Sequence, residues 1–267
     1  MICGVSTACL YPKLLEESLY DLAVSGVSTV EIFINTHSEL KKNFAFGIAD
    51  TLNRFDVKCL SLHPFTCEME QMMFFSPYER RLNDILEYYR LYFQFMNIVG
   101  ADIFVFHGGK GSTSAPREPF CERFSRLFRL GKEFGITVAL ENVSRCQSSS
   151  PAFVRDVAKI LGSEFAFVLD TKQAVRAKEN PFSFLDAAGD KTVHVHISDS
   201  GELGDCLLIG KGRFPIKKFM TRLYELNPNC GVVLELYRNG FTGISDLVTS
   251  YNILSKMADS VQQGGLV

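Results

Sequence analysis

The chain of 267 residues lacks an excess of either charge, with 28 basic and 30 acidic side chains and a net charge of −2. This even balance of positive and negative charge predicts neither a nucleic acid nor a membrane surface as a partner. The chain also lacks an apolar run approaching the roughly 20 residues that a membrane-spanning helix needs. With 46% hydrophobic and 22% charged residues, we expect a globular protein of the cytoplasm.

The eight cysteines include no CxxC pair and are scattered through apolar segments. The first residues, MICGVSTACL, are apolar but carry no basic region ahead of them, so they predict a first strand rather than a signal peptide. We therefore expect reduced, mostly buried thiols.

Two nucleotide-binding patterns are absent. The first predicted turn, residues 6–9, has the sequence STAC and contains no GxGxxG, which argues against an open doubly wound sheet. The glycine-rich run HGGKG at residues 107–111 lacks the spacing of a Walker loop. A tight turn before a loop is the favoured interpretation of that run, with phosphate binding as the alternative.

Strand-like and helix-like segments alternate along the chain. The predicted strands are residues 2–6, 29–34, 57–63, 103–107, 136–141, 165–170, 192–196 and 232–235. The predicted helices are residues 14–25, 40–55, 77–99, 119–134, 151–161, 181–188, 216–226 and 244–257. Eight such units predict an α/β protein with a (β/α)8 TIM barrel. We expect one domain over residues 1–267, with the tail at residues 262–267 frayed.

Four consecutive predicted strands end in a side chain that binds metals well: Glu141, Asp170, His196 and Glu235. Because strand tips of a parallel barrel converge on one rim, these side chains are expected to meet. The mixed oxygen and nitrogen set suits one divalent metal ion, Mn²⁺, Mg²⁺, Co²⁺ or Zn²⁺. Two glutamates on separate strands could also exchange a proton with a carbon next to a carbonyl, through a metal-stabilised enediolate.

Each of these positions also has a structural interpretation. Asp170 could cap the helix that follows it. His196 could be a packed histidine, and spacing does not choose between it and His194, since both side chains lie on the same side of the strand. The joint occurrence at four successive strand tips favours the metal site.

Short motifs across most of the chain resemble those of the xylose-isomerase-like barrels. The motifs are LENV (140–143), LDT (169–171), HISDS (196–200), IGKG (209–212) and LEL (234–236), with SLHPF (61–65) and FHGG (106–109) on the third and fourth strands. This superfamily contains sugar and sugar-phosphate isomerases and epimerases, and also endonuclease IV. Dimers and tetramers are common in it, so the resemblance is compatible with a homo-oligomer.

The resemblance to ketose epimerases implies unequal roles for the four side chains. Glu141 and Glu235 would be catalytic as well as metal-binding, whereas Asp170 and His196 would only bind the metal. The HISDS motif selects His196 over His194.

The chain departs from the endonuclease IV pattern at two motifs. A histidine of its three-zinc cluster is replaced by Gln173, and its DxH element corresponds here to Gly204-Asp205-Cys206. His63 and His107 match the remaining cluster histidines. The departures imply a mononuclear site and no nucleic-acid substrate. Epimerases usually also have a substrate-contacting histidine where this chain has Gln173.

Further residues are candidates for substrate binding. His63 and His107 end the third and fourth predicted strands, where they could contact substrate hydroxyls or be packed histidines. Lys211 and Arg213 follow the seventh strand, where barrels often bind phosphate. Other candidates are Gln173, Lys172, Arg145 and an apolar wall of Phe65, Phe74 and Phe75. Glu31 on the second strand is a further candidate, with a salt bridge inside the barrel mouth as the alternative.

The first functional hypothesis is a metal-dependent isomerase or epimerase of a small sugar or sugar phosphate. Dehydration from the same enolate is a related possibility. The second hypothesis is an endonuclease IV-like DNA repair phosphodiesterase. The third is a non-catalytic barrel that binds a sugar.

Overall fold

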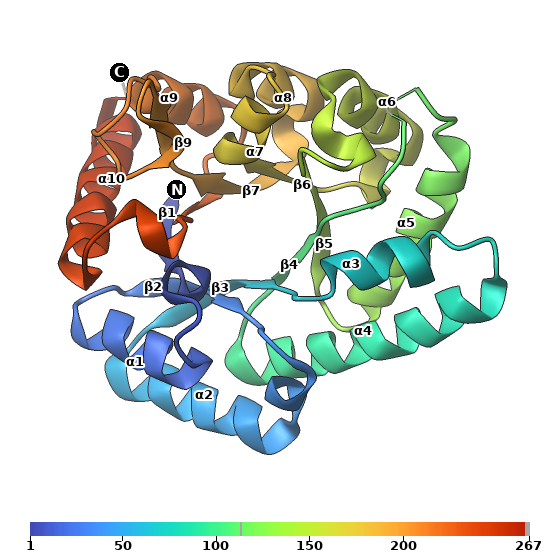
Figure 1. The fold of residues 1–267 in the computed structure, drawn as a ribbon, viewed down its shortest axis with the longest axis horizontal. Coiled ribbons are helices and arrows are strands. Elements are labelled where there is room, and N and C mark those ends of the chain that lie inside the picture. The colour runs from blue at the N-terminus through green and yellow to red at the C-terminus, as the bar shows by residue number, and fades with distance from the viewer. Residues whose placement is uncertain (113, 265–267) are drawn as a thin grey trace.

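Eight parallel strands close into a barrel in the order β1-β10-β7-β6-β5-β4-β3-β2, which confirms the predicted fold (Figure 1). The structure is a computed structural model that describes residues 1–112 and 114–264. The barrel strands are β1 (Ile2–Ser6), β2 (Thr29–Phe33), β3 (Lys58–His63), β4 (Ile103–Phe106), β5 (Thr137–Glu141), β6 (Phe167–Asp170), β7 (Thr192–Ile197) and β10 (Gly231–Leu234). Each of the eight predicted strands is present, with ends shifted by no more than two residues.

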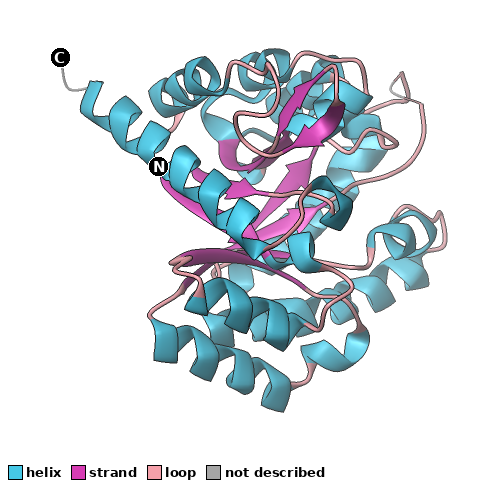
Figure 2. Cartoon of the chain, turned by 60° about the vertical axis from the view of Figure 1, so that its left-hand side comes forward, coloured by secondary structure: helices cyan, strands magenta, loops and turns pink. Residues whose placement is uncertain are grey.

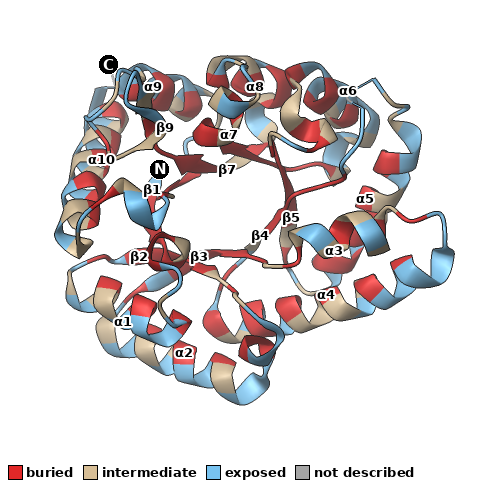
Figure 3. Cartoon of the chain, viewed as in Figure 1, coloured by how far each residue is buried: buried red, intermediate tan, exposed pale blue. Residues whose placement is uncertain are grey.

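Helices surround the barrel (Figure 2), and their buried residues lie mainly on the side that faces it (Figure 3). The eight predicted helices correspond to α1 (Leu15–Val24), α2 (Lys42–Phe55), α4 (Glu79–Val99), α5 (Glu118–Glu133), α6 (Pro151–Leu161), α8 (Pro181–Ala188), α9 (Ile216–Leu226) and α10 (Ile244–Gly264). Helix α10 continues past its predicted end, and the side chain of Gln262 donates a hydrogen bond to the Met1 carbonyl. The first three residues of the predicted frayed tail are therefore helical, and residues 265–267 lie outside the described residues.

Several short elements in the connections were not predicted. These are α3 (Cys67–Met69), a π-helical turn (Glu70–Phe74), α7 (Thr171–Arg176) and a hairpin of β8 (Asp199–Gly201) and β9 (Gly204–Leu207). Each is too short to show a hydrophobic period. All of them follow a barrel strand at its C-terminal end, so they help to shape that end of the barrel.

Side chains alternate between the two faces of a strand, so outward-facing residues can pack against the helices while inward-facing residues form the site. On β4, Phe104 and Phe106 face the helices, where Phe104 packs edge-on against Tyr89 and Phe93 with ring centroids 5.5 and 5.4 Å apart. His107, directly after the strand, instead lies at the central cavity. The abundant phenylalanines thus form an outer core, and the inward positions are left to polar side chains near the C-terminal ends of the strands.

All eight cysteines are free thiols in the described part of the chain, and six of them are buried. This agrees with the expectation of mostly buried thiols. Among the helices in residues 1–112 and 114–264, none has the length and hydropathy needed to cross a membrane.

The loop that contains the IGKG motif is built around the buried carboxylate of Asp199. Its Oδ2 accepts the backbone N–H groups of Gly210 and Gly212 at 3.0 and 2.9 Å, and its Oδ1 accepts that of Phe214 at 3.0 Å. A methyl group at position 212 would overlap both the Asp199 carboxylate and the carbonyl of Ser200. Glycine at 212 is therefore required by close approach.

We expect Gly212→Ala to lower the free energy of unfolding by about 1–3 kcal/mol, because the added methyl group must push the loop away from Asp199. Equilibrium urea unfolding followed by circular dichroism would measure the change. Gly47→Ala in α2 is the matched control, since no described atom lies within 4 Å of the added carbon, and alanine favours a helix. Equal stability of the two variants would contradict the role of this loop.

Candidate metal centre

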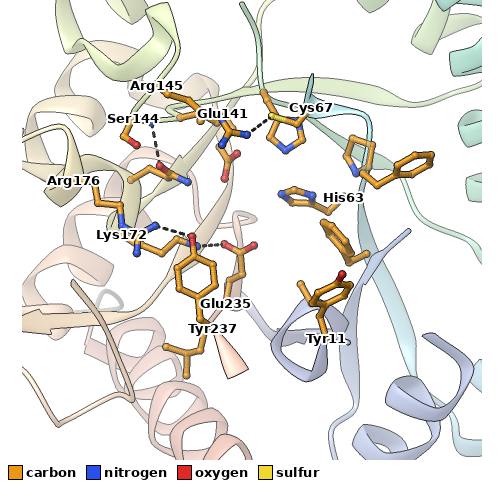
Figure 4. A pocket seen from close by; sticks show the side chains of 18 of the residues that line it. Tyr11, His63, Cys67, Glu141, Ser144, Arg145, Lys172, Arg176, Glu235 and Tyr237 are labelled. Atoms are coloured by element: carbon orange, nitrogen blue, oxygen red, sulfur yellow. Dashed lines mark hydrogen bonds and ion pairs between the residues drawn. The ribbon is translucent and has the colours of Figure 1, made fainter. Parts of the chain in front are cut away.

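A cavity of about 590 Å³ opens at the C-terminal ends of the barrel strands (Figure 4). Its size is within the range of small-molecule sites. The lining residues are Ala8, Tyr11, Phe33, Asn35, His63, Pro64, Phe65, Cys67, His107, Glu141, Val143, Ser144, Arg145, Lys172, Gln173, Arg176, Glu235, Leu236 and Tyr237. They come from strand tips and loops around the whole barrel, so residues distant in sequence form one site.

The four side chains at successive strand ends meet at the floor of this cavity. Glu141, Asp170, His196 and Glu235 each place one potential ligand atom within 4.8 Å of the others. Nδ1 of His196 lies 2.9 Å from Oε1 of Glu141 and 3.6 Å from Oε2 of Glu235. Glu141 and Glu235 line the cavity, whereas Asp170 and His196 are buried beneath it and are not among the lining residues.

The chemistry of this cluster fits a divalent cation. Three carboxylates are buried together, and burial together with Glu235 and Glu141 raises the pKa of Asp170 to about 7, although Lys172 opposes the rise. Oδ2 of Asp170 accepts no hydrogen bond from the residues that the structure describes. Its cationic neighbour is Nζ of Lys172 at 3.3 Å, which it shares with Glu235. Buried carboxylates need compensating cations or donors, and a metal ion among these oxygens would supply further positive charge.

Asp170 combines two roles that the sequence left as alternatives. Its Oδ1 accepts the backbone N–H of Gln173 at 2.9 Å, which caps the N-terminus of α7. Its other oxygen faces the cluster. The cap fixes the side chain, so Oδ2 is held in place for a ligand.

The ammonium group of Lys172 is buried beside two of these carboxylates. Nζ lies 2.9 Å from Oε2 of Glu235 and 3.3 Å from Oδ2 of Asp170, and 4.7 Å from the ring centre of Tyr237. Burial lowers the pKa of Lys172, but Asp170 and Glu235 together raise it well above its usual range. Lys172 therefore carries a positive charge on one wall of the cavity.

The two histidines on β3 and after β4 lie together on the opposite wall. His63 and His107 have ring centroids 4.8 Å apart and, with Glu141, form a second group of possible ligand atoms within 4.8 Å. Nδ1 of His107 lies 3.2 Å from the buried carboxylate of Glu70. Burial and the neighbouring His107 lower the pKa of His63 to about 4, so His63 is neutral near pH 7.

Some of the residues predicted to contact substrate line the cavity. Residues that the sequence did not single out line it as well. Gln173 and Arg145 line it, and Oε1 of Gln173 accepts the backbone N–H of Ser144 at 3.1 Å. The residues missed are Tyr11, Phe33, Asn35, Ser144, Arg176 and Tyr237. Only their place at the end of a barrel strand or in the segment that follows one could have indicated them, since none is part of a hard-ligand pattern.

The structure does not bring Lys211 and Arg213 to the cavity. Both side chains are exposed, and Arg213 pairs with Glu202 at 2.6 Å on the surface. The reason is the loop around Asp199: the N–H groups of residues 210, 212 and 214 point inward to the carboxylate. The structure therefore places these two cations outside the residues that line the cavity, and their contact with substrate stays a prediction.

The predicted apolar wall is also only partly present. Phe65 lines the cavity, but Phe74 is fully buried against Phe106, with ring centroids 5.0 Å apart, and Phe75 stacks on Phe120 at 5.4 Å. The unpredicted π-helical turn directs these two rings into the outer core. Of the three phenylalanines, one remains at the cavity.

Solved structures of similar fold include both sugar epimerases and an endonuclease-family protein. A D-tagatose 3-epimerase-like protein gives a TM-score of 0.80 at 20% identity, with 99% of each chain covered. A D-psicose 3-epimerase from Clostridium cellulolyticum H10, solved with D-tagatose, gives 0.76 at 14% identity, with 98% of this chain and 99% of that chain covered. An AP endonuclease, family 2, from Brucella melitensis gives 0.72 at 15% identity over 93% and 97%. These low identities establish a shared fold.

The sequence comparisons define the family. A search among curated proteins finds no match. The family model described as xylose isomerase-like TIM barrel matches residues 19–254, which is most of the chain. The chain is therefore a member of the xylose isomerase-like TIM barrel family.

Proposed function

We propose that the protein is a divalent-metal-dependent isomerase or epimerase of a sugar or sugar phosphate. The observation that carries the proposal is the division within the tetrad: Glu141 and Glu235 line the cavity, whereas Asp170 and His196 lie beneath it. Side chains that reach the cavity can act on a substrate, and those beneath it can only hold a metal. The same division is the one implied by the resemblance to ketose epimerases.

The two glutamates would move the proton. They extend from β5 and from the end of β10, which are separated in the barrel by β6 and β7. One carboxylate would remove the proton from a carbon next to a carbonyl, and the other would return it from a different side. When bound by the tetrad, a divalent cation would supply Lewis-acid stabilisation of the negative charge that develops on substrate oxygen.

The remaining walls suit a polyhydroxylated substrate. Tyr11, Phe33 and Phe65 offer apolar surface, while Asn35 and Gln173 offer amide groups to hydroxyls. Several of the epimerases of similar fold act on or were solved with ketoses. We therefore infer a ketose or ketose phosphate as the substrate class.

A second candidate function is supported by one specific observation. His63, His107 and Glu141 also place ligand atoms within 4.8 Å of one another, so a second metal would make a multinuclear centre. Such a centre would favour an endonuclease IV-like phosphodiesterase. Gln173, in place of a cluster histidine, weighs against a complete three-metal site, and the number of bound metals decides between the candidates.

We expect purified protein to retain about one equivalent of a divalent metal, and Asp170→Asn and Glu141→Gln to lose it, because each removes a charged ligand. Metal content after dialysis, measured by inductively coupled plasma mass spectrometry, tests this. Asp186→Asn is the control, since its carboxylate is 62% exposed and lies near only Arg222. Three tightly held zinc ions would contradict the mononuclear proposal.

Proton exchange tests the chemistry itself. In D₂O the metal-loaded enzyme should introduce deuterium next to the carbonyl of a ketose or ketose phosphate. Glu141→Gln and Glu235→Gln should each slow the exchange by at least about 10²-fold, because a general base or acid is lost. Mass spectrometry and proton NMR of the recovered substrate provide the measurement.

The surface variant Glu202→Gln, which loses only its contact with Arg213, should exchange at the wild-type rate. No exchange across a broad panel of ketoses and their phosphates would instead favour a sugar-binding barrel without catalysis.

A further inference from the structure

The carboxylate of Glu31 lies below the tetrad and contacts the histidine of the tetrad, His196. Glu31 on β2 is fully buried, and its Oε2 lies 2.9 Å from Nε2 of His196 and 3.1 Å from Nε2 of His194. The hydroxyl groups of Ser61 and Ser6 donate to Oε2 and Oε1 at 2.8 and 3.1 Å. The carboxylate thus joins β1, β2, β3 and β7 across the interior of the barrel.

The other nitrogen of His196 faces the cavity floor. Nδ1 lies 2.9 Å from Glu141 and 3.6 Å from Glu235, on the side away from Glu31. Each nitrogen of one imidazole therefore has a separate carboxylate environment. Only Glu141 and Glu235 line the cavity, and Glu31 has no exposed surface.

We propose that Glu31 is a positioning residue for the metal centre: by accepting the Nε2–H of His196, it leaves the lone pair of Nδ1 directed at the tetrad. A neutral imidazole has one protonated nitrogen, and the hydrogen bond to that nitrogen decides which one is free to bind a metal. A carboxylate in this place also makes the histidine a stronger ligand. The inference rests on the metal centre proposed above.

Glu31 could instead be a ligand, since Glu31, His194 and His196 also form a group of ligand atoms within 4.8 Å. Two observations favour positioning. Both oxygens of Glu31 already accept hydroxyl hydrogen bonds from serines. The two histidines approach the same oxygen, Oε2, at ordinary hydrogen-bond distances, so that oxygen already has partners within the barrel.

The first test is metal affinity. Isothermal titration of metal-free protein with Mn²⁺ or Zn²⁺ should show Glu31→Gln binding about 10–100-fold more weakly than wild type, the range typical of lost partners of ligating histidines. Ser6→Ala is the matched control, because the Ser6 hydroxyl contacts the oxygen of Glu31 that does not face His196, and also the backbone N–H of Ala8. It should change affinity far less. Unchanged affinity of a folded Glu31→Gln variant would overturn the proposal.

A second measurement needs no variant. In Zn²⁺-loaded wild-type protein labelled with ¹⁵N-histidine, long-range proton–nitrogen NMR spectra report which ring nitrogen carries the proton. We expect His196 to be protonated at Nε2. Protonation at Nδ1, with Nε2 bound to zinc, would overturn the proposal even if Glu31→Gln failed to fold.

The outcomes separate this inference from the proposed function. If wild-type protein binds metal and exchanges protons while Glu31→Gln behaves like wild type, only the role of Glu31 is wrong. If wild-type protein binds neither Mn²⁺ nor Zn²⁺, the metal centre and the role of Glu31 are both wrong.

Discussion

The clustering of four carboxylates at one end of the barrel is the constraint on which the site depends. Glu31, Glu141 and Asp170 are buried, and Glu235 is half-buried near them, where little water can screen the charges. Such charges are tolerated only when cations or hydrogen-bond donors compensate them. His196 lies within 4 Å of Glu31, Glu141 and Glu235. Lys172 lies within 4 Å of Glu235 and Asp170, so the polar interior is one continuous network.

The barrel makes this network possible by keeping it apart from the hydrophobic core. Aromatic side chains such as Phe104 and Phe106 pack between strands and helices and hold the strands in place. The inward positions contribute little to that core and can therefore be polar. This division explains how a cluster so unfavourable for folding can be accommodated at the C-terminal rim.

The cavity has two layers of different origin. Its floor is made by strand residues such as Glu141, whose backbone is fixed by neighbouring strands. Its walls are made by loops, for example Tyr11 after β1 and Tyr237 after β10. In barrels of this kind the floor sets the reaction and the loops set the substrate. Gln173, where related proteins have a histidine, lies between these layers, since it is in the first turn of α7 and lines the cavity.

The amino-acid sequence by itself determined the barrel and the meeting of its four strand-tip ligands, because the period of apolar residues is local and parallel strands necessarily end on one rim. It did not determine the loops. Lys211 and Arg213 face away from the cavity because backbone N–H groups turn toward Asp199. Only the tertiary structure placed Glu31 under His196, since that contact joins strands 165 residues apart, and no local pattern encodes a contact across the barrel.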